Sequence, residues 1–247
     1  MEVHHHPHVE KKKFKEYFLE FIMMFLAVTL GFFAENIREH YSENQKEKEF
    51  IRSLIGDLKT DARQLDSIID QRLAKHRMAD SMLIILNSPD LDNYGNQLYF
   101  FARSLPRILV FRSNDGTLLQ LKNAGNLRLI KNTEAVRRIM LYDERIRNWN
   151  HWEDREEFLI QQYYPFLKTM FDARIFESMV HGMEISRPAG NPHLLIKDKE
   201  HIDGLYSQIH FLKNANDFHL ELCRQQLALA KETLDYLQKQ YHLKNEN

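Results

Sequence analysis

The sequence has only one cysteine, Cys223, among its 247 residues. A single cysteine excludes an intrachain disulfide and a cysteine-based zinc cluster, and it leaves the redox compartment undetermined. Glycine and proline are also scarce, with 8 and 6 residues respectively. Few chain breakers favour long helices over a sheet protein, which needs many tight turns. With 43% hydrophobic residues the chain can bury a core, and these features together predict an all-α fold.

Neither sign of charge dominates, because 34 Lys and Arg face 35 Asp and Glu, for a formal net charge of -1. Without an overall basic field, nucleic acid is not expected as a partner. The sequence also lacks a phosphate-binding glycine loop, a Gly-x-Ser-x-Gly elbow and a His-Glu-x-x-His zinc motif. We therefore expect a protein that is not an enzyme and needs no cofactor. A hydrolytic or metal-dependent enzyme is the less favoured alternative.

One apolar segment lies near the N-terminus. Residues 17–34 contain a single charged residue, Glu20, and a membrane span needs about 20 apolar residues, with tolerance down to about 17. We predict a transmembrane helix at residues 17–35, in contact with membrane lipid. A cleaved signal peptide is disfavoured because no small-x-small cleavage site follows, and a buried core helix is the remaining alternative.

Four lysines come directly before this segment, whereas charges of both signs follow it. They are Lys11, Lys12, Lys13 and Lys15. Since positive residues stay on the cytoplasmic side of a membrane, the His- and Lys-rich leader, residues 1–16, should be cytoplasmic. Residues 36–247 should then form an extracytoplasmic helical domain, which in a bacterium is periplasmic and held at the inner membrane by its single span.

Apolar residues at alternating spacings of three and four indicate two long helices. The transmembrane helix should continue as a stalk to about residue 86, with its stripe interrupted at Arg72 and His76. A second long helix, residues 199–241, carries a matching stripe. The stripes consist of Ile51, Ile55, Leu58, Ala62, Leu65 and Ile69, and of Leu220, Cys223, Leu227, Ala230, Leu234, Leu237 and Tyr241. We expect the two helices to pack antiparallel in a bundle.

Shorter elements should connect these two helices. Asn132 or Thr133 is a typical helix N-cap, Gly125 suits the left-handed residue that follows a helix, and Pro165 should kink or stop a helix. The expected elements are helices at residues 93–105, 114–125, 132–163 and 166–180, and a long surface loop at 182–198.

The leader contains the densest group of candidate metal ligands, His4, His5, His6 and His8. Neutral imidazoles bind zinc, nickel or copper, but a flexible leader offers no preformed geometry. A solvated leader with incidental metal affinity is therefore the plainer interpretation. His219 and Cys223 lie four residues apart on one helix face, where core packing is the favoured interpretation over metal binding.

A concentration of aromatic residues marks a possible partner surface at Trp149, His151 and Trp152. Such aromatics are enriched at protein interfaces. A buried aromatic face, with Glu153, Asp154, Glu156 and Glu157 on a solvated face, is the plainer interpretation of the same pattern.

In the membrane segment, Ala27 and Gly31 form a small-x-x-x-small pair that would let two helices approach closely. The stalk could extend such pairing into a homo-oligomer. Packing of the same stripe against the C-terminal helix is the competing use, and a lipid-facing role is the alternative for the small residues.

Three segments resemble an uncharacterised family of single-pass, membrane-anchored helical proteins common in Bacteroidota. They are FKEYFLEF at residues 14–21, FLAVTLGFFAE at residues 25–35 and LLQLKNAGNLRLIKN at residues 118–132. The resemblance implies a topology, and the family supplies no activity or site residues to transfer.

These observations favour a non-enzymatic, membrane-anchored helical scaffold or accessory subunit that acts through protein-protein contacts. A periplasmic ligand-sensing bundle is the alternative. It would have to signal through a partner, because a leader of 16 residues has no room for an output domain.

Overall fold

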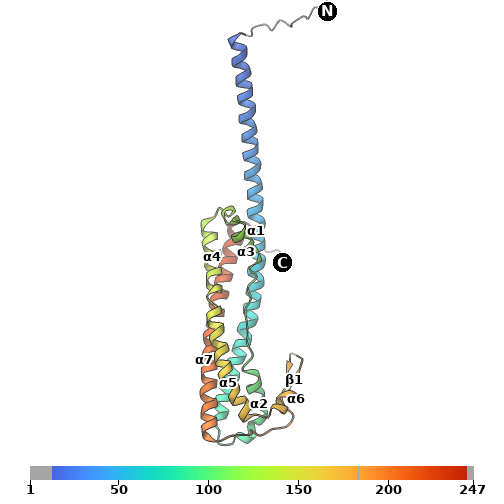
Figure 1. Ribbon diagram of the computed structural model, residues 1–247, viewed down its shortest axis with the longest axis vertical. Coiled ribbons are helices and arrows are strands. Elements are labelled where there is room, and N and C mark those ends of the chain that lie inside the picture. The colour runs from blue at the N-terminus through green and yellow to red at the C-terminus, as the bar shows by residue number, and fades with distance from the viewer. Residues whose placement is uncertain (1–12, 183, 244–247) are drawn as a thin grey trace, which may run out of the picture. The chain divides into compact units, whose positions relative to one another are not determined.

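The computed structural model describes residues 13–182 and 184–243. In this part of the chain the fold is all-α, as expected, with one short β-hairpin. The chain divides into two units, Met1–Glu49 and Phe50–Asn247. The elements labelled in Figure 1, with two short 3-10 helices, are α1 (Phe14–Leu86), η1 (Leu91–Tyr94), α2 (Gly95–Ser104), α3 (Gly116–Asn123), η2 (Asn126–Leu129), α4 (Thr133–Arg147), α5 (Asn150–Met170), α6 (Ala173–Ser178), β1 (Val180–His181), β2 (Glu184–Ile185) and α7 (Lys199–Gln240).

The first unit consists of the N-terminal part of α1. This helix continues without interruption to Leu86, as the absence of strong chain breakers predicted. An 18-residue window within it has a mean hydropathy of 2.0, and none of that window is buried. Among the described residues, α1 is the one helix that is long and apolar enough to cross a membrane.

The second unit is a bundle in which α7 lies beside α4 and α5 and packs with α1 (Figure 1). Three contacts show that α1 and α7 run antiparallel. As the residue number of the α1 partner increases, that of the α7 partner decreases. These contacts join Asp66 to Lys231, the Arg72 carbonyl to Asn216, and Asp80 to Lys213. The predicted antiparallel packing of the two long helices is confirmed.

Both apolar stripes face the interior of this bundle. From the stalk stripe, Ile51, Leu58 and Leu65 are buried, and Ala230 and Leu237 of α7 are fully buried opposite its first part. The stripe is therefore occupied by contacts within the chain. A coiled-coil dimer that used Ile51 and Leu58 would have to displace that packing.

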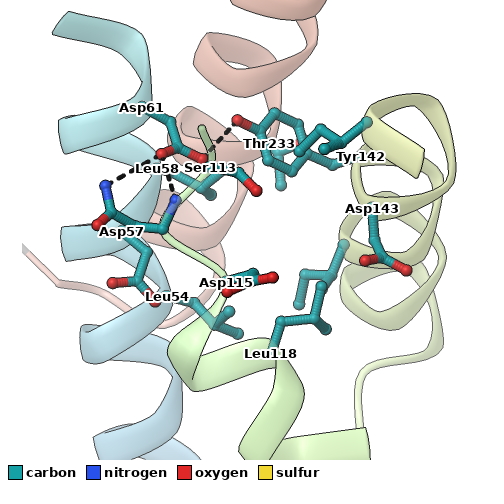
Figure 2. Close-up of a pocket in the computed structure, with 13 residues that line it drawn as sticks. Leu54, Asp57, Leu58, Asp61, Ser113, Asp115, Leu118, Tyr142, Asp143 and Thr233 are labelled. Carbon is teal, nitrogen blue, oxygen red and sulfur yellow. Dashed lines mark hydrogen bonds between the residues drawn. The ribbon is translucent and has the colours of Figure 1, made fainter. Parts of the chain in front are cut away.

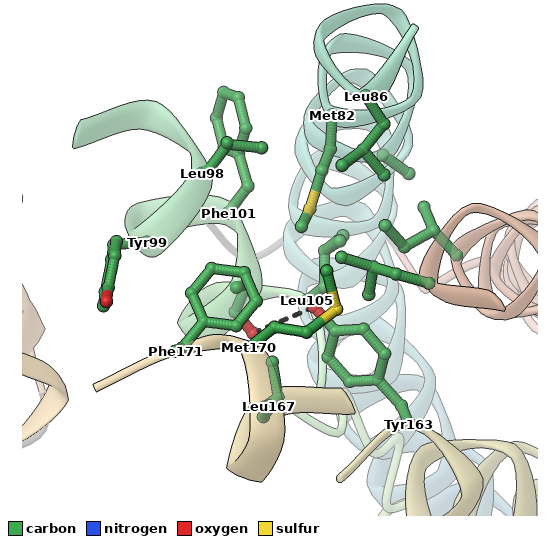
Figure 3. Close-up of a cluster of buried hydrophobic side chains, with 14 of the residues drawn as sticks. Met82, Leu86, Leu98, Tyr99, Phe101, Leu105, Tyr163, Leu167, Met170 and Phe171 are labelled. Atoms are coloured by element: carbon green, nitrogen blue, oxygen red, sulfur yellow. Dashed lines mark hydrogen bonds between the residues drawn. The ribbon is translucent and has the colours of Figure 1, made fainter. Parts of the chain in front are cut away.

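The core consists of three apolar clusters, with buried charged residues between them along α1. Figure 3 shows one apolar end, where Met82 of α1, Phe101 of α2 and Met170 of α5 come together. Along α1, an intermediate cluster at Leu65 and Ile68 and this apolar end are separated by two buried cations, described below.

Two local signals in the sequence are confirmed at the ends of short helices. The Asn132 side chain accepts a hydrogen bond from the Ala135 N–H at 2.9 Å and so caps α4. Gly125 has a positive φ of 64°, the left-handed conformation that glycine adopts without strain.

Of the kink or stop expected at Pro165, the stop is wrong, because α5 continues through this residue to Met170. Proline removes one backbone hydrogen bond within a helix. Buried side chains on both sides, Tyr163 and Leu167, hold the two halves of α5 in the same core. Tertiary packing therefore overrides the local signal.

A continuous helix over residues 166–180 is also wrong. The chain leaves α5 at Phe171, whose ring is buried edge-on against Tyr99 with centroids 5.0 Å apart. The next residue, Asp172, donates its N–H to the Tyr99 hydroxyl at 2.9 Å and caps α6 by accepting from the Arg174 N–H. These contacts stabilise the break.

The described residues of 182–198 are mostly exposed, as expected for a surface loop, but they also contact the bundle. They contain β2, which pairs antiparallel with β1, and their Pro188 and Leu194 are buried. The Asn96 amide donates to the Pro188 carbonyl at 2.7 Å, and the Tyr99 hydroxyl donates to the His193 carbonyl at 3.2 Å. This segment therefore packs against α2 and belongs to the fold.

Candidate functional site

A buried ionic cluster crosses the middle of the bundle. Arg72 and Lys75 of α1 both contact the carboxylate of Glu156 on α5, and all three side chains are almost completely buried. The Arg72 guanidinium reaches the two carboxylate oxygens at 3.1 and 3.3 Å, and Lys75 Nζ reaches Oε1 at 3.0 Å. Arg72 Nη2 also donates to the Leu109 carbonyl at 2.8 Å and Lys75 Nζ to the Arg107 carbonyl at 3.2 Å, both in the segment before α3, whereas the buried Arg72 Nε has no hydrogen-bond partner.

Two cations share one carboxylate in this cluster, and the pKa values follow from that count. Burial alone would raise the pKa of Glu156, but the charges of Lys75 and Arg72 outweigh it and lower the pKa to about 2. Burial lowers the pKa of Lys75, and the single shared carboxylate only partly opposes this. Glu156 is therefore ionised at neutral pH. The unfavourable desolvation of the cluster shows in the lowered pKa of Lys75, because the cluster has two cations and one carboxylate.

Two polar residues of α7 complete the cluster. The Asn216 side chain accepts from Arg72 at 3.4 Å and donates to the Arg72 carbonyl at 3.0 Å. His219 Nε2 lies 3.2 Å from the Trp152 carbonyl, and burial lowers the pKa of this imidazole. Since a carbonyl only accepts hydrogen bonds, Nε2 carries a proton, and the lowered pKa favours the neutral imidazole with Nδ1 unprotonated.

A groove between α5 and α7 opens directly over this cluster. Its volume is about 360 Å³, and the rings of Trp152 and Phe218, which line it, pack against each other with centroids 4.4 Å apart and planes tilted by 52°. Glu156 and His219 are buried at its base, so the groove joins an aromatic surface to the ionic cluster. Its other lining residues are Arg155, Leu159, Phe211, Asn214 and Ala215.

A second polar site lies where α1, α3, α4 and α7 meet (Figure 2). Asp61 accepts hydrogen bonds from the Asn114 N–H at 2.7 Å and from the Tyr142 hydroxyl at 2.8 Å. Burial raises the pKa of Asp61 despite these donors. The adjoining cavity holds only about 30 Å³, so its geometry suits structural anchoring of the loop before α3.

The sequence-based partner surface is only partly exposed. Trp149 is buried, with its ring 5.3 Å from that of Phe111, as the interpretation of a buried aromatic face predicted. Trp152 lines the groove. The side chain of His151 lies outside the described part of the structure. Glu156 was placed on the solvated acidic face, which is wrong, because the side chain is buried with Arg72 and Lys75.

The other candidate residues do not come together. Ala27 and Gly31 are exposed on α1, in the first unit. His4, His5, His6 and His8 lie outside the described residues. His219 and Cys223 are both buried, and in the described part of the chain no group of three or more His, Cys, Asp or Glu side chains is arranged to hold a metal ion.

Sequence reasoning missed the ionic cluster, although one signal was present. Arg72 occupies the apolar stripe of the stalk helix, where a cation requires a buried partner. That partner, Glu156, lies 84 residues further along the chain. It falls on the same helical stripe as Trp152 and Ile160, at spacings of four, which separates it from exposed Glu157.

Comparisons with known proteins do not identify a family. A scan against protein-family models gives no match. Searches of curated proteins and of solved structures also give no match. The function must therefore be argued from the residues of this chain.

Proposed function

We propose that this protein is a membrane-anchored helical scaffold or accessory subunit that acts by binding another protein. Its N-terminal leader would be cytoplasmic and residues 36–247 extracytoplasmic, in the periplasm of a bacterium. The proposal assigns it no catalytic activity.

The observation that carries the proposal is the exposed apolar surface of α1. Large side chains such as Phe25, Leu30 and Phe33 are more than half exposed in the first unit. Apolar surface of this extent is stabilised when it is transferred from water to lipid. The four lysines before the segment favour a cytoplasmic leader, because positive residues stay inside.

The bundle also has apolar side chains available for a partner. Phe158 on α5 is 58% exposed and Leu195, before α7, is 59% exposed. Single exposed apolar residues are common on soluble proteins, so their role has to be tested at individual positions.

Site-specific photo-crosslinking in intact cells tests the partner. A photoreactive residue at Phe158 or Leu195 should crosslink one protein that also copurifies in fixed stoichiometry from native membranes. The control position is Glu232, which is exposed on α7. Crosslinking at Phe158 and Leu195 no stronger than at Glu232 would count against a scaffold role.

A reporter fused after Asn247 tests the topology. We expect activity from a reporter that works only in the periplasm, and replacement of the leader lysines by glutamate should weaken it. Activity of a cytoplasmic reporter at the same position would contradict the proposed orientation.

The groove between α5 and α7 favours a second candidate function, a ligand-sensing bundle that signals through a partner. An apolar cleft with a few buried polar groups at its base is the usual form of a small-molecule site.

A further inference from the structure

We propose that the groove between α5 and α7 binds a small organic anion with a planar apolar body, of the aryl carboxylate class. This inference goes beyond the scaffold role and concerns a different surface from Phe158 and Leu195. It assigns a ligand class to the pocket over the ionic cluster.

The walls of the groove suit a flat apolar ligand. Trp152 of α5 and Phe211 and Phe218 of α7 line it, and both phenylalanines are substantially exposed. An aromatic ligand that inserts beside them would remove this apolar surface from water and gain ring-to-ring contacts. At about 360 Å³, the groove lies at the small end of the range of about 300–1,000 Å³ for ligand pockets.

The base of the groove determines the sign of the ligand's charge. Glu156 is its one buried carboxylate, and both oxygens of that carboxylate already accept from Arg72 and Lys75. Arg72 and Lys75 lie beneath the groove and do not line it, so the buried cluster under the groove holds two cations against one carboxylate, and Glu156 is already paired and not free to receive a cation. Arg155 adds an exposed guanidinium to the lining, and guanidinium groups bind carboxylates with two parallel hydrogen bonds.

A cation is the competing ligand, because aromatic rings also attract ammonium groups. Nearby acidic side chains would have to balance its charge, but two of them are engaged elsewhere. Glu153 pairs with Arg112 at 3.1 Å, and Asp217 pairs with His76 at 2.7 Å. Neutral His219 adds no negative charge. The charges around the groove therefore favour an anion.

Three probes of the same size and different charge test the proposal. They are 3-phenylpropionate, 3-phenylpropanamide and 3-phenylpropylamine, added to the full-length protein in lipid nanodiscs. The sequence has two tryptophans, so Trp149→Phe leaves Trp152 as the sole indole reporter in the groove. We expect the carboxylate to change Trp152 fluorescence with a dissociation constant about tenfold lower than that of the amide, and the amine to bind most weakly.

Paired variants locate the binding. Arg155→Gln should remove most of the preference for carboxylate over amide, whereas Arg224→Gln, on an exposed part of α7, should not. Ala215→Phe should fill the groove and abolish binding, and Ala228→Phe, an exposed control on the same helix, should leave it unchanged. Circular dichroism checks that each variant is folded.

Several outcomes would overturn the proposal. They are no response to millimolar carboxylate, equal affinity for carboxylate and amide, tighter binding of the amine, or unchanged binding in a folded Ala215→Phe variant. Because Arg155 is exposed, its substitution remains a test even if Ala215→Phe fails to fold. None of these outcomes bears on crosslinking at Phe158, so failure of the ligand site and failure of the scaffold role are distinguishable.

Discussion

Glu156→Gln is the substitution that examines the ionic cluster most directly. It removes the carboxylate that contacts both Arg72 and Lys75, while the side chain keeps its shape. The two cations would remain buried, at 2% and 5% exposure, with only carbonyl groups and the Asn216 and glutamine amides as partners. Removing one partner of a buried ion pair typically costs about 3–5 kcal/mol.

The pKa of Glu156 supplies a second measure of the same interaction. It falls from 4.5 to about 2 in the folded protein, and at about 1.4 kcal/mol for each tenfold change in proton affinity this corresponds to about 3 kcal/mol. Because the folded pKa is lowered, this stabilisation is fully present above pH 4.5. It is lost as the pH falls toward 2.

Urea unfolding of the full-length protein in detergent, followed by circular dichroism, measures the effect. At pH 7, Glu156→Gln should lower the free energy of unfolding by about 3 kcal/mol. Between pH 4.5 and pH 2 the difference from wild type should shrink, because wild-type Glu156 becomes protonated. Glu157→Gln is the matched control, since the next side chain is exposed, and it should change stability by less than about 0.5 kcal/mol. Equal stability of the two variants at pH 7 would refute the argument.

Three further substitutions test other parts of the bundle. Asp61→Ala should lower the unfolding free energy by about 2–3 kcal/mol, because it leaves the Asn114 N–H and the Tyr142 hydroxyl without their acceptor. The control Asp66→Ala, at an exposed ion pair, should be nearly neutral. Equal effects of the two substitutions would contradict the assigned hydrogen bonds. Gly95→Ala should lower the melting temperature, since the new Cβ would lie 1.8 Å from the Pro192 carbonyl oxygen. By contrast, the Cβ added by Gly56→Ala meets no atom within 4 Å, and this substitution should stabilise α1 by up to about 1 kcal/mol. Leu58→Asp should destabilise the bundle by several kcal/mol, because it places an unpaired charge among buried apolar side chains; an unchanged thermal unfolding curve would show that this position is not in the core.

The sequence was sufficient to predict the long helices, because their apolar residues recur at regular spacings along the chain. Spacings of three and four identified the buried faces of α1 and α7, and residues such as Ile51, Leu65 and Leu237 are fully buried. The Asn132 cap and the Gly125 turn depend on local chemistry, and they too were predictable. These signals depend on residues that are close together in the chain, so they can be recognised from a single sequence.

Elements that depend on distant contacts were not predictable in the same way. Pro165 lies within a helix because Tyr163 and Leu167 on either side of it are held in the core, and the chain turns at Phe171 because that ring packs on Tyr99. In the site, Trp152 was recognised as a candidate surface residue. Five of the other residues that line the groove come from α7, more than 50 residues away in sequence, and no pattern around Trp152 indicates them.

The ionic cluster and the apolar stripes make different contributions to the fold. Stripes with a heptad-like repeat could shift by seven residues and still place apolar groups together. Arg72 permits no such shift, because it contacts Glu156 of α5 and Asn216 of α7 at the same time. A shifted arrangement would leave two buried cations without their carboxylate, which is costly. The stripes therefore supply most of the burial, whereas the cluster determines the register of the three helices. Since Glu156 and His219 also line the groove, the register that the cluster favours places α5 and α7 so that the rings of Trp152 and Phe218 pack against each other.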